Sequence, residues 1–248
     1  NIIRKILFWK IYTSDFNQID DIFIELDETF NQYGITLKDK QVVELGPGNS
    51  IALALNCLCN GAQKYQMVDK YPRISKSDRQ MKYILKQITY FENKYGRNLN
   101  DFVNKITLEF NQEKLSYVKN SVEDLKTISS DSIDLILSIS VFEHVKDVET
   151  SFQEMNRILK MGGVMYHKID LRDHYNFDNP FKFLEYSDFL WNNLLTKEGF
   201  SYTNRLRVDD FEDILTKHGF EIIELDKLIF DGDLPNKSRL NGKFRKKR

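Results

Sequence analysis

Two glycines occur in the segment 44–50, ELGPGNS, between an apolar run and a helix-prone run. Glycine in such a turn lets the backbone approach a ligand without a Cβ collision, and the N–H groups that open the following helix favour an anion. Asp69 ends the next apolar run, where a carboxylate can accept hydrogen bonds from ribose hydroxyls. Ile51 replaces the third glycine of the dinucleotide fingerprint, which weakens an NAD-binding oxidoreductase hypothesis without eliminating it.

Three of the four histidines, together with several acids, lie within or shortly after two further apolar runs at 133–138 and 164–169. The candidate catalytic set is Glu143, His144, His167, Asp170, Asp173 and His174. Such side chains can take a proton from an acceptor hydroxyl. We select His174 as the first candidate base, oriented by Asp170 or Asp173. Because side chains alternate along a strand, not all of the set can face one pocket, and His167 equally fits a hydrogen-bonded core histidine.

The elements that must position these residues alternate along the chain. Apolar runs and helical periodicity predict strands at 41–45, 65–69, 115–118, 132–138, 164–169 and 220–229, and helices at 16–30, 51–59, 74–95, 148–159 and 209–217. Alternating strands and helices predict a parallel sheet covered by helices on both faces. Candidate bases then lie beyond the carboxyl ends of the fourth and fifth strands, at the crevice of the sheet.

The 248 residues, 41% hydrophobic and 29% charged, are typical of one globular domain without a membrane span. A net charge of −1 disfavours long nucleic acid as a substrate, and the basic tail at 243–248 is best explained as a solvated end. Cys57 and Cys59 stand two apart on a predicted helix and point to different sides, so we expect free thiols and a reducing cytoplasm. Because the first residue is Asn1, we expect a trimmed chain or a piece of a longer product.

The sequence resembles class I S-adenosylmethionine (SAM)-dependent methyltransferases of the type 11 group at five places, in the order of the family's motifs. These are 44–48, Asp69, 120–125, 133–138 continuing into 141–145, and 159–163. The resemblance implies a Rossmann-like, doubly wound seven-stranded sheet with a core at about 35–230. It also implies a helical insertion at about 71–115 and an N-terminal helical segment at 1–34. SAM would be the cofactor and S-adenosylhomocysteine the product. The implied cofactor-binding residues are Glu44, Gly46, Gly48, Asn49, Asp69, Ser121, Val122, Glu123 and Ser138. Ser121 stands where the family often carries an acid.

Two runs, at 166–174 and 204–207, more narrowly resemble bacterial capsule and O-antigen methyltransferases that act on sugar hydroxyls. This implies a sugar or nucleotide-sugar acceptor, whose phosphates Arg172, Arg205 and Arg207 could grip unless they form surface ion pairs. The aromatic residues at 175–202 would pack a helical cover or floor the sugar pocket. Alternatives are methylation of RNA or of a quinone or lipid precursor, and a SAM-binding module without catalysis. The oligomeric state stays open.

The pair Glu143 and His144 resembles part of the Glu-x-x-Glu-His motif that binds a divalent metal in some small-RNA and ubiquinone-pathway methyltransferases. Ser140 replaces the first glutamate and removes one oxygen ligand. We therefore expect no metal, and helix capping beside the cofactor is the leading role for the pair. The alternative is a Mg²⁺ or Mn²⁺ site made by Glu143, His144 and His174.

Overall fold

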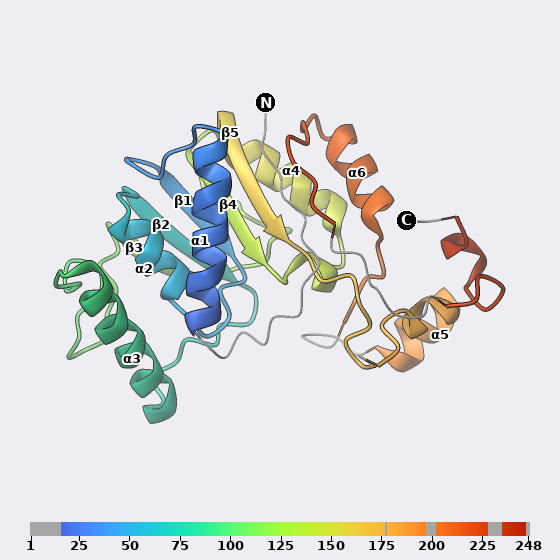
Figure 1. Ribbon diagram of the computed structural model, residues 1–248, viewed down its shortest axis with the longest axis horizontal. Coiled ribbons are helices and arrows are strands. Elements are labelled where there is room, and N and C mark those ends of the chain that lie inside the picture. The colour runs from blue at the N-terminus through green and yellow to red at the C-terminus, as the bar shows by residue number, and fades with distance from the viewer. Residues whose placement is uncertain (1–15, 177, 197–201, 228–234, 247–248) are drawn as a thin grey trace.

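The structure, a computed structural model, describes residues 16–176, 178–196, 202–227 and 235–246 (Figure 1). Its strands are β1 Gln41–Leu45, β2 Lys64–Asp69, β3 Leu115–Lys119, β4 Ile133–Ile139 and β5 Leu159–Lys168. The α-helices are α1 Phe16–Gln32, α2 Ala52–Cys59, α3 Asp78–Tyr95, α4 Val148–Ile158, α5 Asp188–Leu190 and α6 Val208–Lys217. Short 3₁₀ turns are η1 Phe142–His144, η2 Lys182–Glu185 and η4 Gly242–Phe244, and a π-turn is η3 Trp191–Leu195.

All neighbouring strands pair in parallel, in the order β3-β2-β1-β4-β5. The order reverses between β1 and β4, which makes their carboxyl ends the switch point where doubly wound sheets bind ligands. The predicted Rossmann-like α/β fold with a parallel sheet is therefore confirmed.

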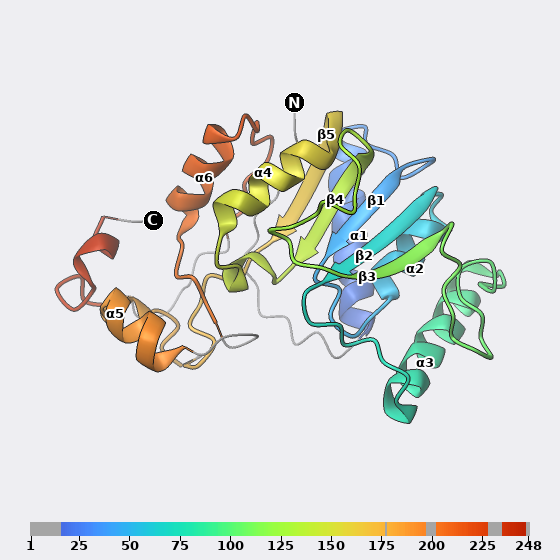
Figure 2. The same cartoon turned by 180° about the vertical axis from the view of Figure 1, so that it is seen from behind.

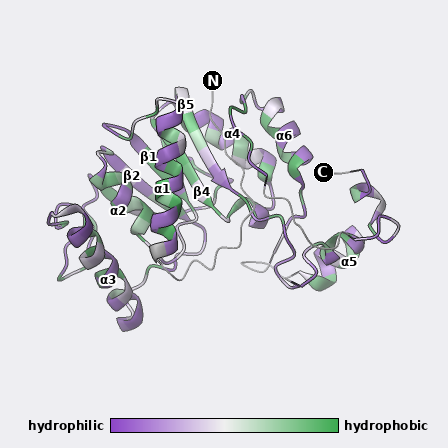
Figure 3. Cartoon of the chain, viewed as in Figure 1, coloured by the Kyte–Doolittle hydropathy of each residue, from purple (hydrophilic) through white to green (hydrophobic). Residues whose placement is uncertain are grey.

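The central strands carry apolar side chains on both faces because they contribute to two hydrophobic layers. Val42 and Leu135 pack into the layer under α1, α2 and α3, whereas their neighbours Val43 and Ile136 pack into the layer under α4 and α6. Figures 1 and 2 show these two groups of helices on opposite faces of the sheet. Hydrophobic residues gather on the strands and the inward helix faces, while α3 is mostly hydrophilic outside (Figure 3).

The predicted seven-stranded sheet is corrected to five strands in the part of the chain that the structure describes. Residues 220–227 of the predicted strand 220–229 form no strand, and the rest of it lies outside the described residues. Their apolar side chains pack instead of extending a ladder. The Phe220 ring lies 5.9 Å from that of Phe152 on α4, and Ile222 and Leu225 border the same cluster. Burial thus satisfies the apolar pattern without backbone pairing to β5.

The segment between β2 and β3 holds one helix followed by a long connection, in the place of the expected insertion at 71–115. The helix begins at Asp78, later than the expected residue 74, because Ser77 caps it by accepting from the backbone N–H of Gln80. Gly96 ends it in the left-handed conformation at φ 60°. Among the described helices, none combines the length and the apolar character that crossing a bilayer requires.

Candidate functional site

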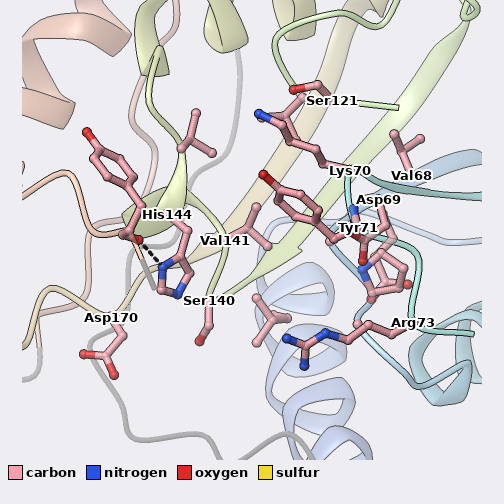
Figure 4. Close-up of a pocket in the computed structure, with 18 of the residues that line it drawn as sticks. Val68, Asp69, Lys70, Tyr71, Arg73, Ser121, Ser140, Val141, His144 and Asp170 are labelled. Atoms are coloured by element: carbon pink, nitrogen blue, oxygen red, sulfur yellow. Dashed lines mark hydrogen bonds between the residues drawn. The ribbon is translucent and has the colours of Figure 1, made fainter. Parts of the chain in front are cut away.

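A cavity of about 660 Å³ opens at the carboxyl ends of β1, β2 and β4, within the size range of small-molecule sites. Ten of the residues predicted from sequence line it: Glu44, Gly46, Gly48, Asp69, Ser121, Val122, Glu123, His144, Asp170 and His174. Figure 4 shows His144 and Asp170 on one side of this cavity and Asp69, Lys70, Tyr71 and Ser121 on the other. The predicted ligand-binding and proton-accepting groups therefore share one space.

The turn after β1 brings backbone to the cavity wall. Gly46 has φ 67°, and its N–H donates to the carbonyl of Val68 at 2.8 Å, which joins the turn to β2. A Cβ on Gly46 would lie 2.5 Å from Cγ2 of Val141, so a side chain has no room there. Gly48 has φ 66° and open space where a Cβ would stand. The two glycines thus serve different needs, close packing at Gly46 and left-handed backbone at both positions.

Two buried carboxyls flank this turn. Glu44 accepts a hydrogen bond from the hydroxyl of Tyr65 at 3.1 Å, and burial raises the pKa of Glu44 to about 8. Asp69 accepts from the backbone N–H of Tyr71 at 2.8 Å. Burial raises the pKa of Asp69 as well, while the backbone amides of Tyr71 and Gly48 act in the opposite direction. A cationic or hydroxyl-bearing ligand between these carboxyls would replace the water they have lost.

The raised pKa of Glu44 predicts a pH-dependent stability. Since its pKa rises from 4.5 to about 8 on folding, the folded state holds one more proton in that window. The contribution of Glu44 to stability is then fully present below pH 4.5 and falls towards pH 8, by at most about 1.4 kcal/mol per pH unit. In urea unfolding at several pH values, Glu44→Gln should lack this component, whereas the exposed control Glu221→Gln should keep it. Equal slopes for Glu44→Gln and the unmodified protein would contradict the assignment.

The opposite wall of the cavity is built on the turn after β4. Ser140 adopts φ 53°, unusual for a residue with a side chain, and its N–H donates to the carbonyl of Lys168 at 2.8 Å. This left-handed residue reverses the chain into η1, so that Val141 reaches Gly46 and His144 reaches the cavity.

His144 is held by its ring. Its Nδ1 lies 2.6 Å from the carbonyl oxygen of Tyr202 (Figure 4). A carbonyl can only accept, so Nδ1 carries the proton and Nε2 keeps a lone pair. Burial lowers the pKa of His144, against the effect of the Tyr202 carbonyl. The imidazole is therefore neutral at neutral pH.

Asp170 and His174 lie beside His144. Arg172 donates to both oxygens of Asp170, from Nε at 2.8 Å and from Nη2 at 2.5 Å. Nε2 of His174 lies 3.6 Å from Oδ2 of Asp170, and the His174 ring is 5.0 Å from that of His144. Burial alone would raise the pKa of Asp170, but Arg172 and His174 outweigh burial and hold it well below its ordinary value. Asp170 is therefore an ionised group that orients its neighbours.

Five residues predicted for the site are not among those lining the cavity: Asn49, Ser138, Glu143, His167 and Asp173. Ser138 Oγ and His167 Nδ1 form a buried hydrogen bond of 2.7 Å, and the His167 ring packs 4.8 Å from that of Phe142, so this histidine is a core residue. Asn49 lies on the outer side of its turn, where its carbonyl accepts from Nε2 of Gln80 at 2.6 Å. The Asp173 carboxylate instead accepts the backbone N–H of Tyr175 at 2.8 Å.

The predicted arginine and aromatic groups are mostly structural. Arg205 is 3% exposed and donates to the carbonyls of Phe183 and Tyr186, and Arg207 donates to the carbonyl of Leu171 at 2.6 Å. Among the described aromatics of 175–202, the rings of Tyr175, Phe183 and Tyr186 surround Trp191, and only Tyr202 of these described residues lines the cavity. Hence Arg172 alone of the three arginines faces the ligand space.

Several lining residues had no signal in the sequence. Lys70, Tyr71 and Arg73 lie within four residues after Asp69. Their place after the end of β2 was the one available indication that they could line the cavity. Ile19 and Ile22, on α1, also line the cavity, and their helical pattern indicated only burial.

Comparison with known proteins gave one match to a protein-family model and matches to solved structures. A family model described as a methyltransferase domain matches residues 81–167, less than half of the chain, from α3 into β5. No curated protein matches the sequence. The family match supports an enzyme of the methyltransferase class, and the cofactor that this class implies is SAM.

Three solved structures illustrate the structural likeness. A proposed methyltransferase of Haloferax volcanii, bound to the Trm112 methyltransferase activator, is 18% identical over 83% of this chain and 72% of its own, with TM-score 0.46. A proposed SAM-dependent methyltransferase of Methanococcus maripaludis is 19% identical over 85% and 88%, with TM-score 0.46. A proposed methyltransferase of Bacillus halodurans is 15% identical over 79% and 69%, with TM-score 0.49. Because these TM-scores are below 0.5, the three structures carry no argument about the fold, which is defined by the observed strand order.

Proposed function

We propose that this chain is a SAM-dependent O-methyltransferase that transfers a methyl group to a hydroxyl of a sugar or nucleotide-sugar in bacterial surface-polysaccharide synthesis. One observation carries the proposal: a single cavity joins the glycine turn and Asp69 to the histidine pair His144 and His174. A transferase needs both a cofactor end and an acceptor end in one enclosed space.

The residues at the first end fit an adenosyl amino acid. Gly46 and Gly48 leave backbone at the cavity wall, Glu44 is placed to pair with an amino group, and Asp69 with ribose hydroxyls. Ser121, Val122 and Glu123 would border the adenine. When bound, SAM supplies a methyl group that its sulfonium makes electrophilic.

At the other end, the chain must align the acceptor hydroxyl and remove its proton as the new C–O bond forms. Nε2 of His144 has the lone pair for this, and its ring is fixed by Tyr202. His174, steadied by Asp170, is the second candidate base. The products are the methyl ether, S-adenosylhomocysteine and one proton.

A hydroxyl-rich acceptor suits the polar lining at this end. Asp170, Arg172 and the two histidines offer both donors and acceptors, and Tyr202 adds an aromatic surface for the C–H face of a sugar. The test is turnover of labelled SAM against a panel of nucleotide sugars, beside RNA and quinone precursors. Methyl transfer to RNA alone would refute the sugar acceptor, and binding of NAD without SAM would refute the transferase.

Asp69→Asn should weaken SAM binding about 10- to 100-fold in isothermal titration, because it removes charge-assisted hydrogen bonds to the ribose. The amide keeps an oxygen for the N–H of Tyr71, so the loop should stay in place. Asp134→Asn is the matched control. Asp134 likewise accepts a backbone N–H, from Gln41 at 2.9 Å. It lies near the amino end of β4, however, at the opposite end of the strands from the cavity. Equal weakening in the two variants would argue against a ribose contact.

A further inference from the structure

The start of α2 is held by a side chain from another helix. Gln87 of α3 is completely buried, and its Oε1 accepts from the hydroxyl of Ser50 at 2.8 Å and from the backbone N–H of Ile51 at 2.9 Å. Oγ of Ser50 in turn accepts from the N–H of Ala52 at 3.1 Å. Two of the N–H groups that were expected from the sequence to meet an anion are therefore engaged within the protein.

A second glutamine of α3 holds the residue before Ser50. Gln80 stands seven residues before Gln87, on the same face of the helix, and its Nε2 donates to the carbonyl of Asn49 at 2.6 Å. Neither glutamine lines the cavity, whereas Gly48, next to Asn49, does. The helix α3 thus fastens the glycine turn from outside the ligand space.

The amide of Gln87 is retained at a cost to packing. Its neighbours on the same helix, Ile84, Ile88 and Phe91, belong to the hydrophobic layer under α3. Nε2 of Gln87 is buried and has no hydrogen-bond partner among the described residues, so part of the amide stays unsatisfied. A leucine would fill this layer without that cost, which indicates that the oxygen at the start of α2 is the function of this side chain.

We propose that Gln87 is a positioning residue for the cofactor, which holds Ser50 and Ile51 so that the glycine turn keeps the shape that SAM binding requires. This inference rests on the proposed function and deepens it, because it gives α3 a role at the cofactor end without contact with the ligand. Gly46 and Gly48 have left-handed backbone and high conformational freedom, so the turn needs support from its surroundings. The bond to β2 supplies it at Gly46, and α3 supplies it after Gly48.

Gln87→Leu tests the proposal because it keeps the approximate size and removes Oε1. It should weaken SAM binding about tenfold in isothermal titration and raise KM for SAM by a similar factor. At saturating SAM, kcat should change by less than about threefold, because Gln87 does not line the cavity. Gln87→Glu returns an oxygen to the same place and should recover most of the affinity. In the ligand-free protein, the Ile51 amide of Gln87→Leu should exchange its hydrogen faster.

Asn56→Leu is the matched control. Asn56 is also completely buried on α2, and its Oδ1 accepts from the hydroxyl of Tyr95 on α3 at 2.7 Å. Its loss removes a polar contact between the same two helices, one turn further from the glycines. Thermal unfolding should show both leucine variants folded and destabilised, whereas only Gln87→Leu should lose SAM affinity. An equal loss of affinity in both, or none in Gln87→Leu, would overturn the proposal.

Ser50→Ala examines the same contact from the other side if Gln87→Leu does not fold. It removes the hydroxyl that donates to Gln87, and it should weaken SAM binding about threefold. Unchanged SAM affinity in this variant would count against the proposal. A failure of the unmodified chain to bind SAM would overturn the proposed function instead. The exchange rate of the Ile51 amide still tests the contact in that case, and an unchanged rate in folded Gln87→Leu would overturn it.

Discussion

Gly46→Ala should destabilise the protein by about 2–4 kcal/mol and abolish measurable SAM binding. About 1–2 kcal/mol comes from placing an alanine in left-handed backbone, and a further part from the Cβ that meets Cγ2 of Val141 at 2.5 Å. Because the turn joins β1 to the cavity wall, the shift that relieves this contact also displaces the N–H groups facing the ligand. Urea unfolding and titration with SAM measure the two effects.

Gly48→Ala separates strain from collision in the ligand-free protein. It has the same sign of φ, 66°, but open space at the Cβ position, so only about 1–2 kcal/mol should be lost. Val141→Ala removes Cγ2 and should restore part of the stability of Gly46→Ala in a double-mutant cycle. Equal destabilisation by the two alanines would show that the contact with Val141 is unimportant.

His144→Gln should lower kcat by about 10²- to 10⁴-fold, with little change in SAM affinity. The loss is expected because the amide of glutamine has no basic nitrogen that could take the acceptor proton as Nε2 does. Val141 lies between His144 and Asp69 in the cavity, so SAM binding should be unaffected (Figure 4). Single-turnover kinetics with saturating SAM measure the chemical step directly.

His174→Gln tests the sequence-based preference for His174 as the base. In the structure, His174 Nε2 faces Asp170, whereas His144 Nε2 is the unprotonated nitrogen of a fixed ring, so we expect the larger loss at His144. His218→Gln should retain full activity, because its partner Glu149 is on the surface. Undiminished turnover by His144→Gln would remove this residue from the reaction.

Local signals predicted the five strands of the sheet and the glycine turn and aspartate that line the cavity. Gly46, Gly48 and Asp69 are found from sequence because turn chemistry and strand ends act over a few residues. The position of His144 in the cavity could not be predicted in this way, because its ring is held by the carbonyl of Tyr202, a partner 58 residues away in sequence. His167 was a candidate until its bond to Ser138 showed it in the core.

The same limit explains the predicted strand at 220–229. Its apolar pattern is real, but period and propensity report burial and not the identity of the partner. Phe220 is buried against Phe152 on α4, and the described residues add no strand beside β5. Likewise, the crowding of aromatic residues at 175–202 predicted packing as one alternative, but it did not indicate that they gather around Trp191.

In the proposed reaction, the pairing of β1 with β4 determines how far the cofactor and the acceptor stand apart. The residues proposed to bind the cofactor follow Leu45 and those proposed to bind the acceptor follow Ser138, and Leu45 and Ser138 are register partners. Sliding one strand past the other by a single residue would move the reacting atoms by about 3.3 Å. That is close to the whole contact distance of about 3–3.5 Å at which a methyl group can be passed on, and a misplacement of about 1 Å already slows such reactions about a hundredfold. The hydrogen bonds between β1 and β4, which do not contact a ligand, therefore set the distance between the reacting groups.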